Sequence, residues 1–272
     1  MSRLLVRPTP PDEEGRVIRV TPESAGWDHV GFSVHRLDTG RHTGFCEPDR
    51  ETCIVVLSGT VTVEAGQERY EGIGERDSVF EDRSPGAVYI PRNLEARITA
   101  STAAAIALCS APARNGGSAR RIPCEKISRE TRGEGTNLRH VRAILPETEP
   151  AENLLIYEVI TPGGHWSSYP PHKHDTDRIP EESALEETYY HLLNPEQGFA
   201  FQRVYTDDRS IDETMTVEHG DCVLVPRGYH PVGAPHGYEL YYLNVMAGPK
   251  RSWIFRNDPA HEWILEPQAQ RR

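Results

Sequence analysis

The chain has 272 residues, a formal net charge of −11 with histidine neutral, and 37% hydrophobic residues. This length accommodates one large β domain or two ordinary ones. The negative charge argues against a nucleic-acid partner or an anionic membrane surface, because phosphate binding requires a basic face. A small anionic substrate is still compatible with a locally basic pocket.

The N-terminal segment MSRLLVRPTPP has only three adjacent apolar residues, too few for the core of a signal peptide. Nowhere is an apolar run long enough to cross a membrane. The five cysteines show no CxxC spacing, which favours free thiols over a disulfide framework or a thiolate zinc site. We therefore predict a cytoplasmic protein.

Short β-branched or aromatic segments bounded by turn residues follow one another along the chain, which predicts an all-β jelly roll or barrel. Helical turns are expected only around 128–132 and 259–263. Strands are expected at 53–59, 60–66, 87–91, 96–100, 153–164, 187–193, 199–206, 222–228 and 238–248.

The order of these segments repeats once. A strand pair, an acidic loop and a strand running into Pro-Arg (AVYIPRN) occur in the first half, and ETYYHLL, a loop and HGDCVLVPRGYH occur in the second. Two jelly rolls in tandem would explain the length. The segment 110–137 is rich in Gly, Ser and Arg and suits a connector, so we expect domains at 1–120 and 121–272.

Candidate metal ligands lie in the second half. His172 and His174 are two apart in SSYPPHKHD, and an extended backbone directs both imidazoles to one face. Glu186 or Glu187 follows in LEETYYH, and His230 follows in PRGYH. Three histidines and a carboxylate suit a divalent metal, with Zn or Mn favoured, and leave positions open for water or substrate. Periodicity does not choose between the two glutamates, since both faces of that strand carry a tyrosine.

This motif order resembles the cupin superfamily, in which one motif supplies two His and a Glu and a second supplies the third His. The resemblance implies Glu187 as the carboxylate ligand. The spacings depart from the usual ones, with an insertion between His174 and the glutamates and one residue missing before His230. The first half has no HxH, and His42 is the only nearby candidate for a ligand. We expect that half to be metal-free, with a structural or interface role.

Over essentially the whole chain, SSYPPHKHD, VPRGYHPV, YYLNVMAGPKRSW and DSVFEDRSPGAVYIP resemble the 5-deoxy-glucuronate isomerase family of inositol catabolism. Its sister family is the 4-deoxy-L-threo-5-hexosulose-uronate ketol-isomerase. The resemblance implies a tandem double-stranded β-helix (bicupin) and an aldose–ketose isomerase that converts 5-deoxy-glucuronate to 2-deoxy-5-keto-gluconate. A divalent metal would polarise the carbonyl and stabilise an enediolate, and a base would carry a proton between adjacent carbons.

The substrate carboxylate requires a cation. Arg203, inside the apolar strand FQRVY, is the first candidate because its guanidinium can form a bidentate contact. Lys173 and Arg227 are further candidates. The alternative for Arg203 is a salt bridge to Asp207 or Asp208.

Tyr229 and Tyr242 are candidates to donate to substrate hydroxyls or to shuttle a proton; the alternative for each is a core role with a satisfied hydroxyl. Two other functions stay open: a cupin dioxygenase, because three His and a Glu also serve iron, and a non-catalytic sugar-binding cupin. A flat β-surface of the first half is compatible with a homo-oligomer.

Overall fold

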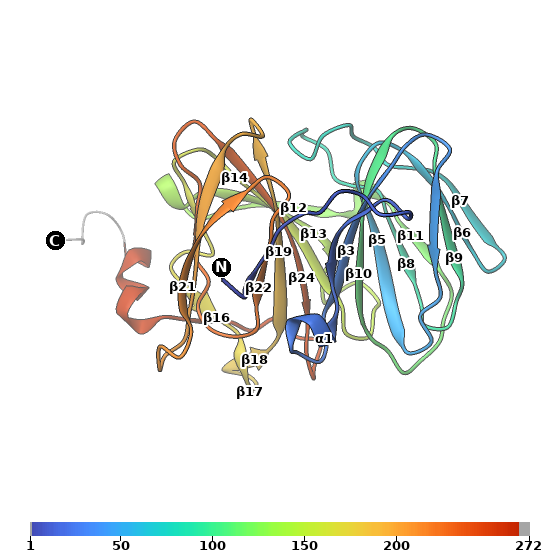
Figure 1. Ribbon diagram of the computed structural model, residues 1–272. Helices are drawn as coiled ribbons and strands as arrows, with labels where there is room; N and C mark the ends of the chain where they lie inside the picture. Colours follow the sequence, from blue (N-terminus) through green and yellow to red (C-terminus); the bar gives the residue numbers. More distant parts are fainter. Residues whose placement is uncertain (1, 267–272) are drawn as a thin grey trace.

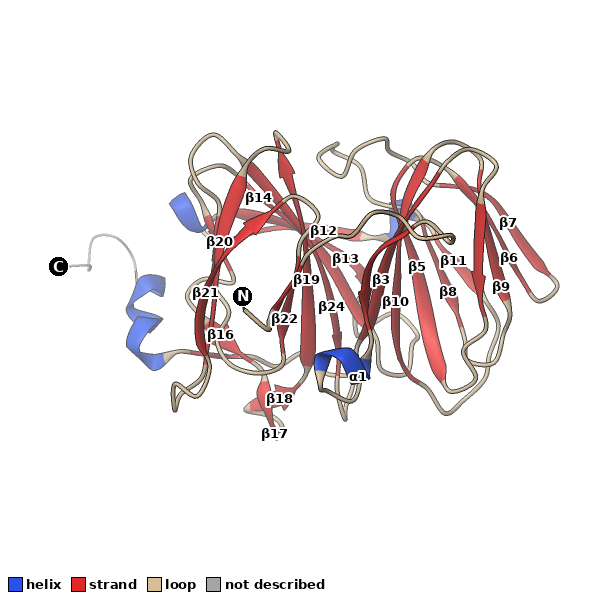
Figure 2. Cartoon of the chain, viewed as in Figure 1, coloured by secondary structure: helices blue, strands red, loops and turns tan. Residues whose placement is uncertain are grey.

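The computed structural model describes residues 2–266. Figure 1 shows two β-barrels side by side, one from each half of the chain. Nearly every element is a strand (Figure 2). The prediction of an all-β fold with two jelly rolls in tandem is therefore confirmed.

The first barrel has two antiparallel sheets and the short helix α1 (Pro22–Ala25). The larger sheet contains, in spatial order, β11 (Arg120–Ile122), β8 (Ala87–Ile90), β5 (Arg50–Ser58), β10 (Ala104–Pro112), β3 (Gly31–Leu37) and β2 (Arg16–Val20). The smaller sheet contains β4 (His42–Phe45), β9 (Ala96–Ala100), β6 (Val61–Ala65) and β7 (Glu68–Ile73).

The second barrel repeats this plan. Its larger sheet contains β1 (Leu5–Val6), β22 (Cys222–Val225), β19 (Glu186–Asn194), β24 (Glu239–Ala247), β14 (Leu155–Thr161), β13 (Arg139–Leu145) and β12 (Ser128–Arg132). Its smaller sheet contains β15 (Trp166–Ser167), β23 (Val232–Gly233), β20 (Phe199–Tyr205) and β21 (Asp212–Glu218). Two strand pairs complete it: β16 (His172–Lys173) with β25 (Arg256–Asn257), and β17 (Asp175–Arg178) with β18 (Glu182–Ala184).

Three short 3-10 helices lie outside the sheets: η1 (Cys124–Lys126), η2 (Gly135–Asn137) and η3 (Pro259–Leu265). The last agrees with the turn predicted at 259–263. The turn predicted at 128–132 is instead strand β12, because this segment pairs along its whole length with β13. Tertiary pairing overrides its weak local preference.

The two halves are interleaved at the N-terminus. β1 pairs with β22 of the second barrel, with Leu5 opposite Val223, although we expected residues 1–120 to form the first domain. At the other end of that range, β11 still pairs with β8 of the first barrel. The first strand of the chain therefore belongs to the second barrel, in the sheet that also contains β19 and its candidate metal ligand.

The two larger sheets pack against each other, and the residues between them form a core shared by both halves. A buried ion pair crosses this interface. Arg76 of the first barrel contacts both carboxylate oxygens of Glu158 on β14 at 2.7 Å, and Arg142 contacts the same carboxylate at 2.8 Å. Burying three charges is tolerable only because each is paired and hydrogen-bonded.

The barrel interiors differ in chemistry. The first is packed with aliphatic side chains such as Ile54, Val63 and Ile98, and His42 lies exposed on β4. The second interior contains tyrosines among its core residues, including Tyr189 and Tyr242. The polar chemistry of the fold is thus concentrated inside the second barrel.

Candidate metal centre

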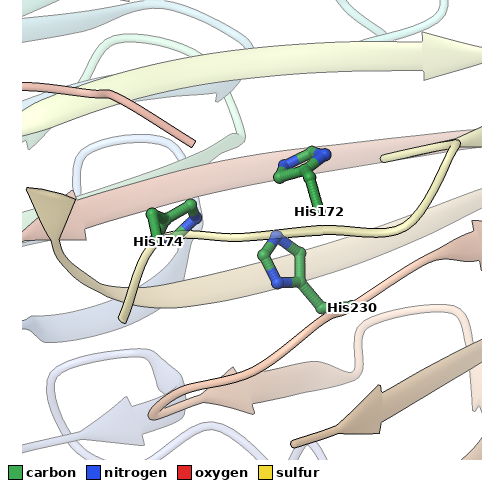
Figure 3. Close-up of side chains that lie close together, drawn as sticks. All are labelled: His172, His174 and His230. Atoms are coloured by element: carbon green, nitrogen blue, oxygen red, sulfur yellow. The ribbon is translucent and has the colours of Figure 1, made fainter. Parts of the chain in front are cut away.

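Figure 3 shows the imidazoles of His172, His174 and His230 lying close together. His172 begins β16, His174 follows that strand, and His230 lies between β22 and β23. Their side chains offer nitrogen atoms that all lie within 4.8 Å of one another. The residues are 8%, 2% and 0% exposed, so the site lies in the barrel interior.

Two of the rings are oriented by backbone carbonyls. His230 Nδ1 donates to the Gly228 carbonyl at 2.9 Å, and His174 Nδ1 donates to the Leu185 carbonyl at 3.2 Å. Because a carbonyl only accepts, Nδ1 carries the proton and Nε2 keeps its lone pair. Such a second contact is typical of metal-binding histidines.

Glycine is required at 228. Its φ of +92° favours glycine, and a Cβ there would meet the Tyr205 carbonyl oxygen at 2.4 Å. The close approach lets the loop turn so that its own carbonyl faces the His230 ring. Gly228 in the sequence PRGYH therefore helps to fix the orientation of the His230 ring.

Glu187 completes a ligand set that fits a cation. Its Oε2 lies 3.1 Å from His174 Nε2 and 3.3 Å from His230 Nε2. His230 Nε2 is buried and has no hydrogen-bond partner among the described residues. Lone pairs facing a carboxylate at this range repel it unless a positive charge lies between them. A divalent cation coordinated by these atoms would satisfy both.

Burial favours the neutral form of two of the three histidines. Burial, followed by the charges of His230 and His174, holds the pKa of His172 well below its usual range. Burial lowers the pKa of His230 to about 4. In His174 burial also lowers the pKa, but the contact with Glu187 outweighs it and the pKa is raised. Neutral imidazoles at 172 and 230 are in the form that binds metal.

Glu186 points the other way. Its carboxylate accepts from the backbone N–H groups of Asp28, His29 and Val30 in the first barrel, at 2.8–2.9 Å. Consecutive strand residues face opposite sides, so Glu187 faces the histidines and Glu186 faces the neighbouring barrel. The two glutamates that periodicity left open have separate positions.

Tyr242 lies in the same interior. Its ring is 4.9 Å from that of Tyr189, which in turn is 5.6 Å from His230. The Tyr189 hydroxyl pairs with Ser168 at 2.8 Å. Burial raises the pKa of Tyr242 above its usual value, so its phenol stays protonated and can donate.

Tyr229 and Arg203 both have acidic partners in the structure. The buried Tyr229 hydroxyl donates to Asp207 at 2.9 Å. Arg203 makes a bidentate pair with Asp212 at 2.7 and 2.8 Å on the outer face of β20. Neither side chain has a contact with the three histidines among the hydrogen bonds and ion pairs of residues 2–266.

The other predicted cations are also occupied or remote. Lys173 Nζ contacts Asp175 at 2.7 Å and Asp207 at 3.1 Å, on the opposite side of β16 from His172. Arg227 donates to the Ser210 hydroxyl at 3.2 Å, in an exposed position. Sequence reasoning missed a further cation, Arg139, which starts β13 on the strand face of the core residues Val141 and Ala143.

The fold and these residues define a bicupin with a candidate metal centre in its second barrel. The chain belongs to the KduI/IolB family, whose model matches residues 4–264. Among the described residues, no helix has the length and apolar character needed to span a membrane.

Relatives match over almost the full length. The chain is 55% identical over 266 residues to the 5-deoxy-glucuronate isomerase of Geobacillus thermodenitrificans, covering 98% of this chain and 97% of that protein. It is 52% identical over 253 residues to the 5-deoxy-glucuronate isomerase of Bacillus subtilis, covering 92% and 93%.

Solved structures agree on the fold. The crystal structure of an IolB-like protein from Salmonella typhimurium superposes with a TM-score of 0.94 at 46% identity, covering 97% of this chain and 99% of that one. Bacillus subtilis oxalate decarboxylase, an enzyme with Mn(II) centres, gives a TM-score of 0.66 at 14% identity, covering 99% and 82%. The second likeness shows the fold alone.

Proposed function

We propose that this protein is an aldose–ketose isomerase that converts 5-deoxy-glucuronate to 2-deoxy-5-keto-gluconate in inositol catabolism. The observation that carries the proposal is a cluster of three buried histidines in which His230 Nε2 has no hydrogen-bond partner among the described residues, in a chain 55% identical to a 5-deoxy-glucuronate isomerase. Isomerisation moves the carbonyl from C1 to C2, so a hydrogen leaves C2, one is gained at C1, and no oxidant is consumed.

His172, His174, Glu187 and His230 hold the divalent metal in this proposal, with Zn or Mn as the favoured ions. When bound, the metal supplies Lewis-acid polarisation of the substrate carbonyl. The mutual approach of the nitrogen atoms and the carbonyl-fixed orientation of two rings support this ligand set. A site without thiolates keeps the metal a hard-to-borderline Lewis acid.

Tyr242 serves as a hydrogen-bond or proton donor in the reaction. Its raised pKa keeps the phenol protonated at neutral pH, so it donates to a substrate oxygen on which negative charge develops. The surrounding walls of Val141, Val159 and Met246 exclude water, which strengthens that hydrogen bond. Tyr242 is the candidate of the two predicted tyrosines that faces the site.

The test is the metal dependence of uronate turnover. Protein stripped with a chelator is assayed with 5-deoxy-glucuronate, then again after addition of Zn or Mn, while an electrode follows oxygen. We expect turnover to be lost and then restored, with no oxygen consumed. Oxygen uptake would support a dioxygenase instead, and saturable sugar binding without turnover would support a binding protein.

Two features of the protein's setting stay predictions from the sequence. We propose a cytoplasmic location, because the five cysteines lack CxxC spacing and are free thiols. A homo-oligomer is the second, and its measurement is the mass in solution by light scattering.

A further inference from the structure

Arg139 faces the interior of the second barrel. It starts β13 on the same face as Val141 and Ala143, which belong to the core of that barrel. The alternate residue Arg142 faces the other barrel and pairs with Glu158. By the two-residue period of a strand, Arg139 directs its side chain into the space that also contains the histidines.

Its guanidinium lacks a carboxylate partner. Nη1 donates to the Asn137 carbonyl at 3.1 Å, and no ion pair joins Arg139 to any acidic side chain of residues 2–266. A guanidinium has five N–H donors, so most of them have no protein acceptor within this part of the chain. Burial, the first cause, lowers the pKa of Arg139, as expected of a cation that has lost water without gaining an anion.

A second arginine raises the positive potential at this position. Arg132 lies directly opposite Arg139 in the pairing of β12 with β13. Like charges in this position destabilise a sheet. Arg132 is compensated by Glu130 and lies over the Trp253 ring at 5.3 Å, whereas Arg139 is not. An anion that reaches Arg139 from the barrel interior would remove the repulsion.

The strand register places Arg139 and Tyr242 on one interior face. Val141, two residues after Arg139, lies opposite Val159, and Val159 lies opposite Tyr242. Val141, Val159 and Tyr242 all belong to the core of the second barrel. By the two-residue period of a strand, Arg139 is therefore on the same face of the sheet as Tyr242.

We propose that Arg139 binds the C6 carboxylate of the uronate substrate and so directs the C1 aldehyde toward the three histidines. This inference rests on the proposed function, in which the carboxylate lies at the opposite end of a six-carbon chain from the reacting aldehyde. A planar fork and a carboxylate form two parallel hydrogen bonds, which fix the orientation of the chain as well as its affinity.

The test compares two substrates, 5-deoxy-glucuronate and 5-deoxy-glucose, which carries a neutral hydroxymethyl group at C6. In Arg139→Gln we expect kcat/KM for the uronate to fall about 100-fold, as for loss of a charge-assisted pair, while that for the neutral sugar changes little. Arg139→Lys, which keeps the charge without the fork, should lose about tenfold. Arg209→Gln, on the exposed outer face of the same barrel, should leave both values unchanged.

Binding gives a readout that does not depend on turnover. The C1 alcohol obtained by reducing the aldehyde of the substrate is titrated by calorimetry into wild type and into both Arg139 variants, each checked for an unchanged melting temperature. We expect the affinity of Arg139→Gln to fall about 100-fold. An unchanged affinity, or an unchanged preference for the uronate, in either folded Arg139 variant overturns the inference. Wild-type protein that binds the alcohol but does not isomerise the aldehyde overturns the proposed function instead.

Discussion

Asp175 Oδ2 accepts a hydrogen bond from the backbone N–H of Gly228 at 2.9 Å. The contact joins the loop that carries His174 to the loop that carries His230. Gly228 in turn offers its carbonyl to His230 Nδ1 at 2.9 Å, and the other carboxylate oxygen of Asp175 is held by Lys173 at 2.7 Å. Lys173 and Asp175 of the sequence HKHD therefore help to orient the candidate metal ligands His174 and His230.

Replacing Asp175 by Ala should therefore weaken metal binding without removing a ligand. We expect an affinity loss of about 10–100-fold, typical of a lost supporting contact, measured by competition with a chromophoric chelator. Ser210→Ala, on the surface near Arg227, is the control and should bind metal normally. Wild-type affinity in a folded Asp175→Ala protein would show that the contact is dispensable.

The adjacent glutamates should separate metal binding from stability. Glu187→Gln leaves an amide facing two histidine nitrogens and should lose most bound metal in elemental analysis, with the fold retained. Glu186→Gln removes the charge that holds the 28–30 backbone and should keep its metal while unfolding at lower denaturant concentration. Retained metal in Glu187→Gln would exclude Glu187 as a ligand.

Substitutions of Tyr242 and Tyr229 should have different effects on kcat. Tyr242→Phe removes the interior hydroxyl and should lower kcat by about 10²-fold, in the range for a lost acid–base group, with bound metal unchanged. Tyr229→Phe removes the hydrogen bond to Asp207 and should leave kcat within about threefold of wild type. The reverse order of effects in steady-state assays would place the active hydroxyl on Tyr229.

The ion pair between the barrels should contribute strongly to stability. Arg76→Ala leaves the buried carboxylate of Glu158 with only Arg142 and the Tyr241 hydroxyl. We expect the free energy of unfolding in urea to fall by about 3–5 kcal/mol, the cost of breaking a buried pair. Arg69→Ala, in an exposed pair with Glu64, should change it little. Equal effects of both variants would contradict the buried interface.

The metal-ligating part of the site could be predicted because its residues follow the order of a known motif. His172, His174 and His230 occur in that order in the sequence, and the fold brings them together. The preference for Glu187 agrees with the face on which it lies. Alternation alone does not say which face is interior, so the sequence leaves open whether Arg203 contacts the substrate or an acidic side chain; in the structure its partner is Asp212.

Other features depended on contacts distant in sequence. The Tyr229 hydroxyl donates to Asp207, 22 residues earlier in the chain, a contact that motif order does not indicate. Arg139 carries no signal in the sequence because it follows a Gly-rich segment typical of a connector, and its strand is recognised only from the burial of Val141 and Ala143. Glu186 binds the backbone of residues 28–30 across the two barrels. No local sequence pattern indicates this contact.

The account is tested most directly by proton NMR of 5-deoxy-glucuronate incubated with metal-loaded protein in D₂O. We predict loss of the aldehyde signal, appearance of hydroxymethyl signals of 2-deoxy-5-keto-gluconate, and no reaction with a His172→Ala, His230→Ala variant that lacks metal. An unchanged aldehyde signal with folded, metal-loaded wild-type protein would contradict the central claim that this histidine cluster serves an aldose–ketose isomerase.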